Sequence, residues 1–336
     1  MRRTPIIPVL CFTLSLIAIS DAWIPTIPNP TIPNPNFNVP MEHSPATSRR
    51  ELLQHGFVRS ITIATGIVLV SGRQEAVADG QEGPVIAVLG ANGKTGMEVV
   101  YALIQNNMIP ISMTRSGTNP FERNRKLSDV IKAKIVHYPN PVDVTSIESL
   151  RDAFTTVRPS GIIFCASSSP AGGLPSQVDN VGVQNAALLA KEIKARFVLI
   201  SALAVDRPDS QSFQITNTLG GRLNGIMDAK LAGENSVRKT LKDFVIVRPG
   251  VLMNGISRNG AADIEINQGD YIGGGLSRDE LAAISVAALQ SKEQGVTIEA
   301  YRTNTRTKLQ KEFNEFSGKE QHGRTYTDLF QSVTSD

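Results

Sequence analysis

The chain lacks the cysteines and histidines that most disulfide frameworks and metal sites require, and it lacks an excess of either charge. Its 336 residues include two cysteines and four histidines, with a formal net charge of +3. We expect Cys11 to be removed with an amino-terminal segment, so Cys165 keeps no partner and the mature fold needs no oxidising compartment. Without a Cys/His cluster we expect no metal site. The balanced charge gives no support for binding to nucleic acid.

The amino terminus also lacks an apolar run of the roughly 20 residues that a membrane-spanning helix needs. Residues 1–22 instead combine two arginines, a shorter apolar run and small residues at the end, which is typical of a signal peptide. Residues 23–40 are rich in proline and asparagine and predict an unstructured linker. A second signal follows, with a twin arginine at Arg49-Arg50, an apolar run over 61–70 and an Ala-x-Ala end. A buried or membrane-resting helix is the alternative interpretation of that run.

Two signals in tandem resemble the bipartite presequences of nucleus-encoded proteins in algae with complex plastids. In that pattern the first cleavage site lies directly before an aromatic residue. Here the bond between Ala22 and Trp23 fits this position. The resemblance implies a plastid location. The protein would lie in the stroma or, if the twin arginine acts as a translocation signal, in the thylakoid lumen. The secretory pathway is the alternative, and peripheral association with a thylakoid membrane is a partner hypothesis. We assign 1–22 to a signal peptide, 23–80 to a transit and linker segment with the second signal, and 81–336 to the folded domain.

The folded domain opens with a pattern for nucleotide binding. Val85–Leu89 is a continuous apolar run, as expected of a strand buried on both faces of a parallel sheet. A turn with three glycines follows directly, and then helical composition over 97–104. Strand, glycine turn and helix in this order predict a Rossmann dinucleotide site. The turn residues assigned to the cofactor are Gly90, Asn92, Gly93, Lys94, Thr95 and Gly96.

Each glycine of the turn has a physical role in such a site. Gly90 permits the tight turn, Gly93 lets the pyrophosphate approach the backbone, and Gly96 lets the helix pack closely on the sheet. The helix N-terminus then offers free N–H groups and a positive dipole end to the phosphates. A P-loop is excluded, because it requires a glycine five positions before Gly93, where this chain has Val88.

The end of the next strand indicates which dinucleotide binds. Sites for NAD usually place an acidic residue there for the ribose 2′-hydroxyl, whereas a basic residue accommodates a 2′-phosphate. Here the strand ends at Arg115, nineteen residues after Gly96. Lys94 can reach the same phosphate from the glycine turn. A solvated surface arginine is the alternative, but together the two residues favour NADP(H) as the cofactor.

Strands and helices alternate through the rest of the domain, which predicts an α/β fold: a doubly wound, mostly parallel Rossmann sheet in one globular domain with a small C-terminal part over the substrate. The expected strands are 110–114, 133–137, 161–166, 196–200 and 244–248, and the expected helices are 146–157, 177–194 and 224–241. Segments 211–224 and 252–276 should cover the site, and the amphipathic tail 326–333 should pack on the domain. Cys165 reads as a buried core residue rather than a nucleophile.

In this order of features the chain resembles the atypical short-chain dehydrogenase/reductases, especially their NmrA-like plastid and bacterial members. The resemblance runs from about residue 84 to the end and rests on Gly90-x-x-Gly93-x-x-Gly96, Arg115, Asp143-Val144, Ser201, Lys230, Val247–Gly250 and Leu276–Ala282. It implies that Asp143 and Val144 contact the adenine. Ala166 and Ser167 would pack on the cofactor, Lys230 would bind the nicotinamide ribose, and Pro249 and Gly250 would line the nicotinamide end.

The chain departs from this family at one important position. In standard members a tyrosine four residues before the lysine gives a proton to the substrate carbonyl, and a serine helps to hold the substrate. That position is Ile226, while Ser201 and Lys230 remain as candidate catalytic residues. Asp228 could replace the tyrosine only with a strongly raised pKa, and helical spacing turns it away from Lys230. An exposed Lys230 paired weakly with Glu234 is the alternative interpretation of the lysine.

Two functions therefore stay open. The first is an NADP(H)-dependent oxidoreductase acting on a small carbonyl, quinone or enone-like molecule, because Ser201 and Lys230 are retained. The second is a noncatalytic NADPH-binding redox sensor or an assembly or scaffold factor at a plastid membrane, because the tyrosine is missing. A nucleotide-sugar epimerase is a weaker third reading, since that chemistry also uses the tyrosine. The sequence names no substrate and indicates no oligomeric state.

Overall fold

The computed structural model describes residues 83–122, 124, 127–170, 172–218, 221–253, 259–308 and 322–336. The expectations for residues 1–80 lie outside the described residues. Within the described ranges no helix has both the length and the apolar character needed to cross a membrane.

The described domain is built on an eight-stranded sheet in the order β3-β2-β1-β4-β5-β6-β11-β8. All neighbouring strands run parallel except β8, which is antiparallel to β11. In chain order the strands are β1 (Val85–Leu89), β2 (Ile109–Met113), β3 (Val136–His137), β4 (Gly161–Phe164), β5 (Arg196–Ile200), β6 (Phe244–Pro249), β8 (Ile264–Asn267) and β11 (Val296–Arg302). The predicted doubly wound Rossmann fold is confirmed.

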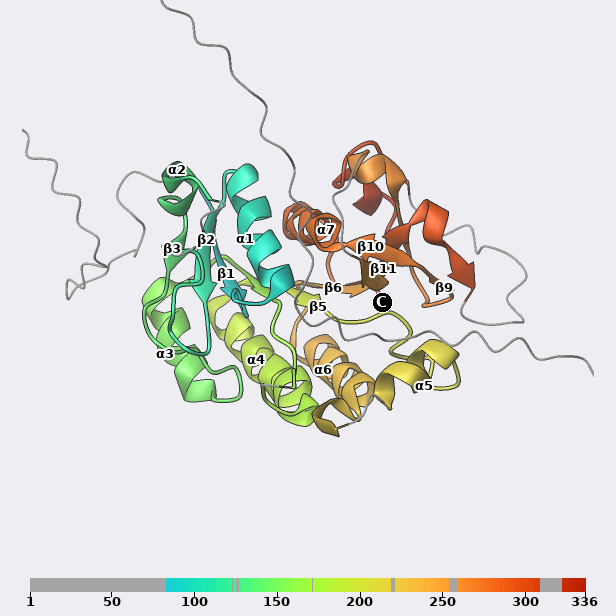
Figure 1. Cartoon of the computed structure of the whole chain (residues 1–336), viewed down its shortest axis with the longest axis horizontal. Coiled ribbons are helices and arrows are strands. Elements are labelled where there is room, and N and C mark those ends of the chain that lie inside the picture. Colours follow the sequence, from blue (N-terminus) through green and yellow to red (C-terminus); the bar gives the residue numbers. More distant parts are fainter. Residues whose placement is uncertain are drawn as a thin grey trace, which may run out of the picture. The chain divides into compact units, whose positions relative to one another are not determined.

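Helices cover both faces of this sheet (Figure 1). On one face α1 (Lys94–Gln105) packs against α7 (Arg278–Gln290). On the other face lie α3 (Ile147–Val157), α4 (Val183–Ile193) and α6 (Ile226–Thr240), with α3 against α4 and α4 against α6. Short helices α2 (Asp129–Lys132) and α5 (Gln211–Asn217) precede β3 and α6.

Strand β1 shows why the continuous apolar runs become central strands. Ile86 and Val88 belong to the core beneath α1 and α7, whereas Ala87 and Leu89 belong to the core beneath α3 and α4. All four side chains are buried, at most 3% exposed. Because successive side chains of a strand point to opposite faces, only an uninterrupted apolar run can fill both cores.

Two helix starts follow local capping chemistry. The Ser146 hydroxyl accepts the N–H of Ser149 at 3.2 Å and so caps the start of α3. Ser277 and Glu280 form a reciprocal capping box at the start of α7. The helix therefore begins inside the segment Leu276–Ala282, and Leu276 itself lies in the preceding short strand β10 (Gly275–Ser277), which pairs with β7 (Val251–Met253).

The C-terminal half adds small elements around the sheet edge. β9 (Ile272–Gly273) pairs with β12 (Thr307–Lys308), and Tyr301 of β11 is fully buried. Leu329, Phe330 and Val333 of the tail are buried in the core beneath α1 and α7, which confirms that the tail packs on the domain.

One predicted helix is not uniform. Residues 176–182 form wide π-helical turns (Ser176–Gly182), and the regular α4 begins only at Val183. Such local widening changes which side chains face inward, and it occurs frequently at functional sites.

Candidate cofactor and active site

The glycine turn after β1 has no room for side chains at two positions. Gly90 has φ +81°, and a Cβ there would lie 2.7 Å from the backbone nitrogen of Ala166. A Cβ on Gly96 would lie 2.3 Å from the carbonyl oxygen of Gly90. The turn therefore brings the start of α1 close to the end of β4, and this close approach is what a backbone cradle for a pyrophosphate requires.

The start of α1 is open to an anion. Gly93 is the residue that precedes the first helical turn, and no side chain caps the helix there. Asn92, Gly93 and Lys94 are exposed and Thr95 is half-buried. The unpaired N–H groups of a first helical turn and the positive end of the helix dipole favour phosphate at this position.

Two exposed cations flank the turn. Lys94 lies in the first position of α1, and Arg115 follows the end of β2. Neither has a hydrogen bond or an ion pair with any residue of the described ranges. Both are therefore available to a phosphate group, which is what a 2′-phosphate contact needs.

Asp143 and Val144 form the loop between β3 and α3. One carboxylate oxygen of Asp143 accepts both the N–H and the hydroxyl of Thr145, each at 2.9 Å. Val144 is buried beneath Gly182, where a Cβ would lie 2.8 Å from a Val144 methyl carbon. The Asn185 amide donates to the carbonyl of Val144 at 3.2 Å, so α4 fixes this loop.

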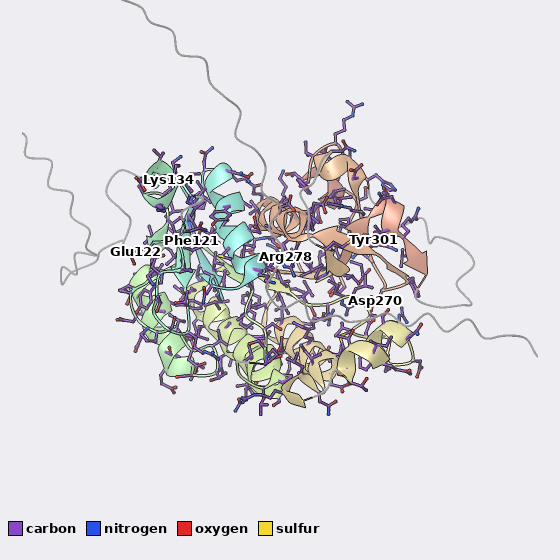
Figure 2. All side chains as sticks on the ribbon, viewed as in Figure 1. Phe121, Glu122, Lys134, Asp270, Arg278 and Tyr301 are labelled. Carbon is purple, nitrogen blue, oxygen red and sulfur yellow. The ribbon has the colours of Figure 1, made fainter. Side chains whose placement is uncertain are left out.

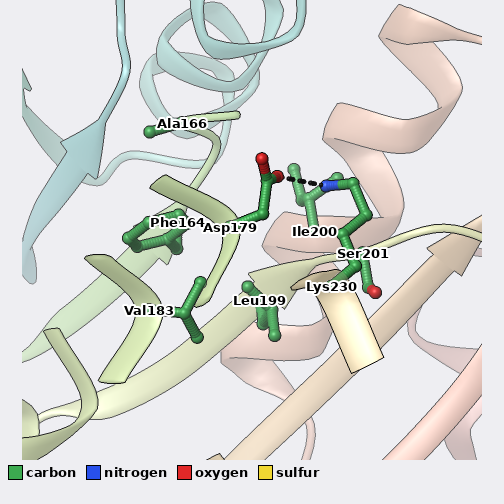
Figure 3. A pocket seen from close by; sticks show the side chains of 8 residues that line it. All are labelled: Phe164, Ala166, Asp179, Val183, Leu199, Ile200, Ser201 and Lys230. Atoms are coloured by element: carbon green, nitrogen blue, oxygen red, sulfur yellow. Dashed lines mark hydrogen bonds and ion pairs between the residues drawn. The ribbon is translucent and has the colours of Figure 1, made fainter. Parts of the chain in front are cut away.

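A small pocket lies where β4 and β5 end, and Figure 3 shows the side chains that line it. Its polar members are Asp179 from the π-helical turns, Ser201 after β5 and Lys230 from α6, and its apolar members include Ala166 and Leu199. The Lys230 ammonium donates to the Asp179 carboxylate at 2.8 Å. The structure thus brings together the two predicted catalytic residues, Ser201 and Lys230, and adds a carboxylate to them.

Asp179 is held as an anion by three donors. Its side chain is 1% exposed, and that burial alone would raise its pKa. The Lys230 ammonium, the Ser167 hydroxyl at 2.7 Å and the Ser168 N–H at 2.9 Å outweigh burial and hold the pKa below its usual value. Asp179 is therefore ionised near neutral pH and has no proton to give.

Two buried hydroxyls at this place have no hydrogen-bond partner among the described residues. Ser201 is 6% exposed and Ser168 is 9% exposed, and the Oγ atoms of both are unsatisfied. An unsatisfied buried polar group costs about 1–3 kcal/mol. These serines follow β5 and β4 at the carboxyl ends of the strands, where open α/β sheets bind their ligands, so the unpaired hydroxyls and the glycine turn fit a bound dinucleotide.

A glycine sets the position of Lys230. A Cβ on Gly233, one helical turn further along α6, would lie 2.3 Å from the carbonyl oxygen of Asp179. Only glycine lets α6 approach the π-helical turns this closely, and the approach places Lys230 beside Asp179. The interpretation of Lys230 as an exposed lysine paired with Glu234 is therefore wrong, because its side chain is 12% exposed and bound to Asp179.

None of the other residues considered as a replacement for the tyrosine is available as a proton donor. Ile226, at the tyrosine position, begins α6. Asp228 is exposed and accepts the Asn217 amide at 2.7 Å, and Asn217 in turn accepts the N–H of Met227 at 2.8 Å. Asn217 is thus a cap for α6. Burial raises the pKa of the Cys165 thiol, which fits a core residue rather than a nucleophile.

Pro249 and Gly250 lie at the end of β6 and are buried. A Cβ on Gly250 would lie 2.1 Å from the carbonyl oxygen of Gly274, so the chain leaves the sheet in close contact with the segment that leads into β10. Val251 follows with its side chain 74% exposed. The predicted covering segment 252–276 is only partly described, because residues 254–258 lie outside the described ranges.

Arg248, next to Pro249, is the centre of a buried charge cluster. Its guanidinium donates to both carboxylate oxygens of Glu234, at 3.0 and 2.7 Å, and to Asp206 at 3.1 Å. Glu299 at 3.4 Å and Asp270 at 3.6 Å complete the cluster. Figure 2 shows Asp270 and Tyr301 toward one end of the sheet, with Phe121 toward the other.

The Arg248 cluster holds more carboxyl groups than positive charges. Burial, reinforced by a hydrogen bond to Asp206 and by the charge of Glu299, raises the pKa of Asp270 to about 9. Burial also raises the pKa of Glu299 to about 7, although Arg248 opposes the shift. Asp206 is more exposed, and its pKa is lowered despite partial burial. Asp270 is therefore protonated at neutral pH and donates to Asp206.

Asp179 and the Arg248 cluster escaped the sequence reasoning for different reasons. Asp179 shares a helical face with Val183, Ala186 and Ala190, all buried, and an acid on an apolar face is a signal that could have found it. The four carboxyl groups around Arg248 come from distant parts of the chain, and no sequence spacing links them. Among the described residues, no set of three or more potential ligands is arranged for a metal ion.

Comparison with known proteins supports a dinucleotide-binding fold. The sequence profile of a family described as NAD(P)H-binding matches residues 90–292. Among solved structures, the chain is similar to the oxidoreductase ylbE from Lactococcus lactis, with 16% identity, a TM-score of 0.51 and coverage of 66% of this chain and 92% of that one.

Two further structures have bound dinucleotides. A short-chain dehydrogenase/reductase from Veillonella parvula in complex with NADP has 13% identity and a TM-score of 0.49, covering 66% of this chain and 96% of that one. The enzyme WbmG from Bordetella bronchiseptica in complex with NAD has 14% identity and a TM-score of 0.49, covering 69% and 77%. No curated protein sequence matches the chain. At these identities the similarity is one of fold.

Proposed function

This chain belongs to the NAD(P)H-binding family, and we propose that it binds NADP(H) and reduces a small carbonyl, quinone or enone-like substrate. The observation that carries this proposal is the pocket at the ends of β4 and β5. Lys230 and Ser201, whose hydroxyl has no partner in the described ranges, both line this pocket at the same ends of the strands as the glycine turn. Hydride transfer to a carbonyl carbon needs a nearby group that forms a hydrogen bond to the carbonyl oxygen, and this pocket offers such groups.

The preference for NADP(H) rests on charge at the adenosine end. Lys94, at the start of α1, and Arg115, after the end of β2, are exposed and free of protein partners in the described ranges, and in a Rossmann site these two places face the adenosine half of the dinucleotide. No carboxylate follows β2 at the position where one would bind a 2′-hydroxyl, since that residue is Arg115 itself. A phosphate would gain two charge-assisted contacts there, whereas a hydroxyl would gain none.

A specific observation favours a second function. The tyrosine position holds Ile226, and Lys230 is drawn to Asp179 rather than left free. These features fit a noncatalytic NADPH-binding sensor or assembly factor that kept the fold. The two functions share the cofactor and differ in turnover, so one series of measurements separates them.

The test is a titration of the protein with NADPH and NADH, followed by nicotinamide fluorescence. We expect NADPH to bind more tightly, and Arg115→Ala to weaken NADPH by about tenfold, or 1.4 kcal/mol, with little effect on NADH. Lys191→Ala is the matched control, because this exposed cation lies in the last turn of α4, just before the start of β5, whereas Arg115 follows the end of β2. Equal binding of both dinucleotides would remove the 2′-phosphate assignment, and turnover of added carbonyls then decides between reductase and sensor.

We also propose that residues 1–80 direct the protein to a plastid. Fusion of this segment to a fluorescent protein in an alga with a complex plastid should give plastid fluorescence. Retention in the secretory pathway would refute the bipartite interpretation.

A further inference from the structure

The lysine of the pocket has spare hydrogen-bonding capacity. An ammonium has three N–H donors, and one of those on Lys230 goes to Asp179. No further hydrogen bond joins Lys230 to a residue in the described part of the chain. Its side chain is buried except for 12%, and it faces the same pocket as the orphaned hydroxyl of Ser201. Both residues line the same small pocket, in which the Lys230 nitrogen is directed toward the Asp179 carboxylate (Figure 3).

The remaining groups around the pocket are unable to supply a proton. Ile226 has no acidic hydrogen. Asp179 is ionised, and Asp228 is exposed and already accepts the Asn217 amide. Ser201 alone is a weak acid, since no base in the described ranges bonds to its hydroxyl. The ammonium of Lys230 is the one group here that both carries a labile proton and is held in place.

We propose that Lys230, positioned by Asp179, is the proton donor to the substrate's carbonyl oxygen, in place of the hydroxyl that Ile226 lacks. Ser201 gives the second hydrogen bond to that oxygen. This inference rests on the proposed reductase function. It assigns Lys230 to the substrate rather than to the nicotinamide ribose, because the Asp179 contact keeps the ammonium on the pocket side of α6.

The proton and electron balance is simple. When bound, the reduced dinucleotide supplies the hydride that adds to the carbonyl carbon. The electron pair of the C=O double bond moves to the oxygen, which takes a proton from Lys230. The broken N–H bond leaves its electron pair on the nitrogen, so Lys230 becomes a neutral amine.

A path for reprotonation is present. The neutral amine recovers its proton from solvent, which reaches the 12% of the Lys230 side chain that is exposed. Asp179 is a positioning residue in this scheme, since it acts through Lys230 and never meets the substrate.

The experiment measures cofactor affinity and turnover separately. The variants are Lys230→Met, Lys230→Arg, Asp179→Asn and Ser201→Ala, with Lys239→Met as the control because Lys239 is an exposed lysine at the far end of α6. NADPH affinity is followed by nicotinamide fluorescence. NADPH oxidation is followed with phenanthrenequinone and 2,3-butanedione as probes, in H2O and in D2O.

We expect Lys230→Met to change the NADPH dissociation constant by less than about threefold and to lower kcat by about 100-fold or more, the range of general-acid catalysis. Lys230→Arg keeps the charge but is too weak an acid, so its kcat should fall as far. Asp179→Asn should lower kcat with an unchanged KM for the probes. The wild-type kcat should be lower in D2O, and Lys239→Met should match the wild type.

Three results would overturn the proposal. Weakening of NADPH by more than about tenfold in Lys230→Met, with kcat of the bound complex kept, would return the lysine to the ribose. Wild-type turnover in Lys230→Arg would show that charge alone suffices. A wild-type protein that binds NADPH and reduces neither probe refutes the proton donor together with the reductase, and leaves cofactor binding standing. If Lys230→Met fails to fold, the double variant Asp179→Asn/Lys230→Met removes both buried charges and serves instead.

Discussion

The buried proton on Asp270 makes the stability of the domain depend on pH in the alkaline range. Asp270 has no exposed side-chain surface, and its pKa is about 9 in the folded protein against an ordinary value of 3.8. A carboxyl group with a raised folded pKa stabilises the fold fully below its unfolded pKa, and this stability is lost as pH rises through the folded pKa. Between pH 7 and pH 9 the folded state therefore binds about one proton more than the unfolded chain.

The size of the effect follows from that proton. One proton difference corresponds to about 1.4 kcal/mol per pH unit. Glu299, with a folded pKa of about 7, contributes mainly below this window. Because the proton is shared within the Arg248 cluster, we take about 2 kcal/mol as the loss between pH 7 and pH 9. For a domain of this size that loss lowers the melting temperature by roughly 4–8 °C.

The perturbation that tests this reasoning is Asp270→Asn. The amide has the shape of the protonated carboxyl: its oxygen can still accept the Ala204 N–H, which Asp270 accepts at 2.7 Å, and its NH2 can donate to Asp206. The variant has no proton to lose, so its melting temperature should change little between pH 7 and pH 9. Thermal unfolding followed by circular dichroism at pH 6, 7, 8 and 9 measures both proteins.

Asp209→Asn is the matched control, since Asp209 is exposed and lies on the loop after β5 that also carries Ala204, the residue whose N–H bonds to Asp270. It should keep the wild-type slope. Parallel curves for wild type and Asp270→Asn would show that Asp270 is ionised in the folded protein, and the assignment of a buried proton would be abandoned.

Two further predictions concern close packing, and a third concerns the C-terminal residue. Gly96→Ala places a methyl group 2.3 Å from the carbonyl oxygen of Gly90, so we expect a loss of about 1–3 kcal/mol in urea unfolding and weaker NADPH binding; unchanged values would disprove the close approach. Leu329→Ala removes a fully buried side chain and should cost about 2–5 kcal/mol, whereas a cost near zero would mean that the tail is detached in solution. Asp336→Ala removes a partly exposed ion pair with Arg238 and leaves the N–H of buried Thr297 without its acceptor, so it should cost about 1–3 kcal/mol by the same unfolding, whereas a cost near zero would mean that the C-terminal residue is detached in solution.

The sequence was most informative where structure depends on neighbours along the chain. β1 and β5 match their predicted bounds, because an apolar run buried on both faces leaves little freedom of register. The Ser146 cap and the glycine turn are likewise local. Strand edges were less certain, and only Val136 and His137 remain of the predicted third strand, since β3 lies at the edge of the sheet and pairs with β2 alone.

Features that depend on distant segments stayed invisible. β7 and β10 pair across a connection that no local pattern specifies, and the π-helical turns at 176–182 interrupt what reads as one helix. Lys230 was found by its place in a family pattern, but its partner Asp179 lies 51 residues away in sequence. Which charged side chains form ion pairs depends on the fold. The sequence shows which charges are present, but not which of them lie close together.

The backbone segment that begins at Ser201 connects the pocket around Lys230 with the Arg248 cluster. Its N–H donates to the Val247 carbonyl at 2.8 Å, and three residues later the N–H of Ala204 donates to Asp270. Ala204 has φ +65°, a strained conformation for a residue with a side chain, and the Asp270 contact holds it there. The segment after β5 is thus anchored at both ends by β6 and by the Arg248 cluster.

These contacts fix the backbone at Ser201, and its hydroxyl has no hydrogen-bond partner among the described residues. The unsatisfied Ser201 hydroxyl is therefore held where a ligand atom can satisfy it, and the about 1–3 kcal/mol that it costs in the free protein would be regained on binding. If so, a bound ligand should raise the melting temperature of the wild type by more than that of Ser201→Ala. An equal rise in both would place the ligand's polar atoms away from Ser201 and would weaken the case for a substrate oxygen between Ser201 and Lys230.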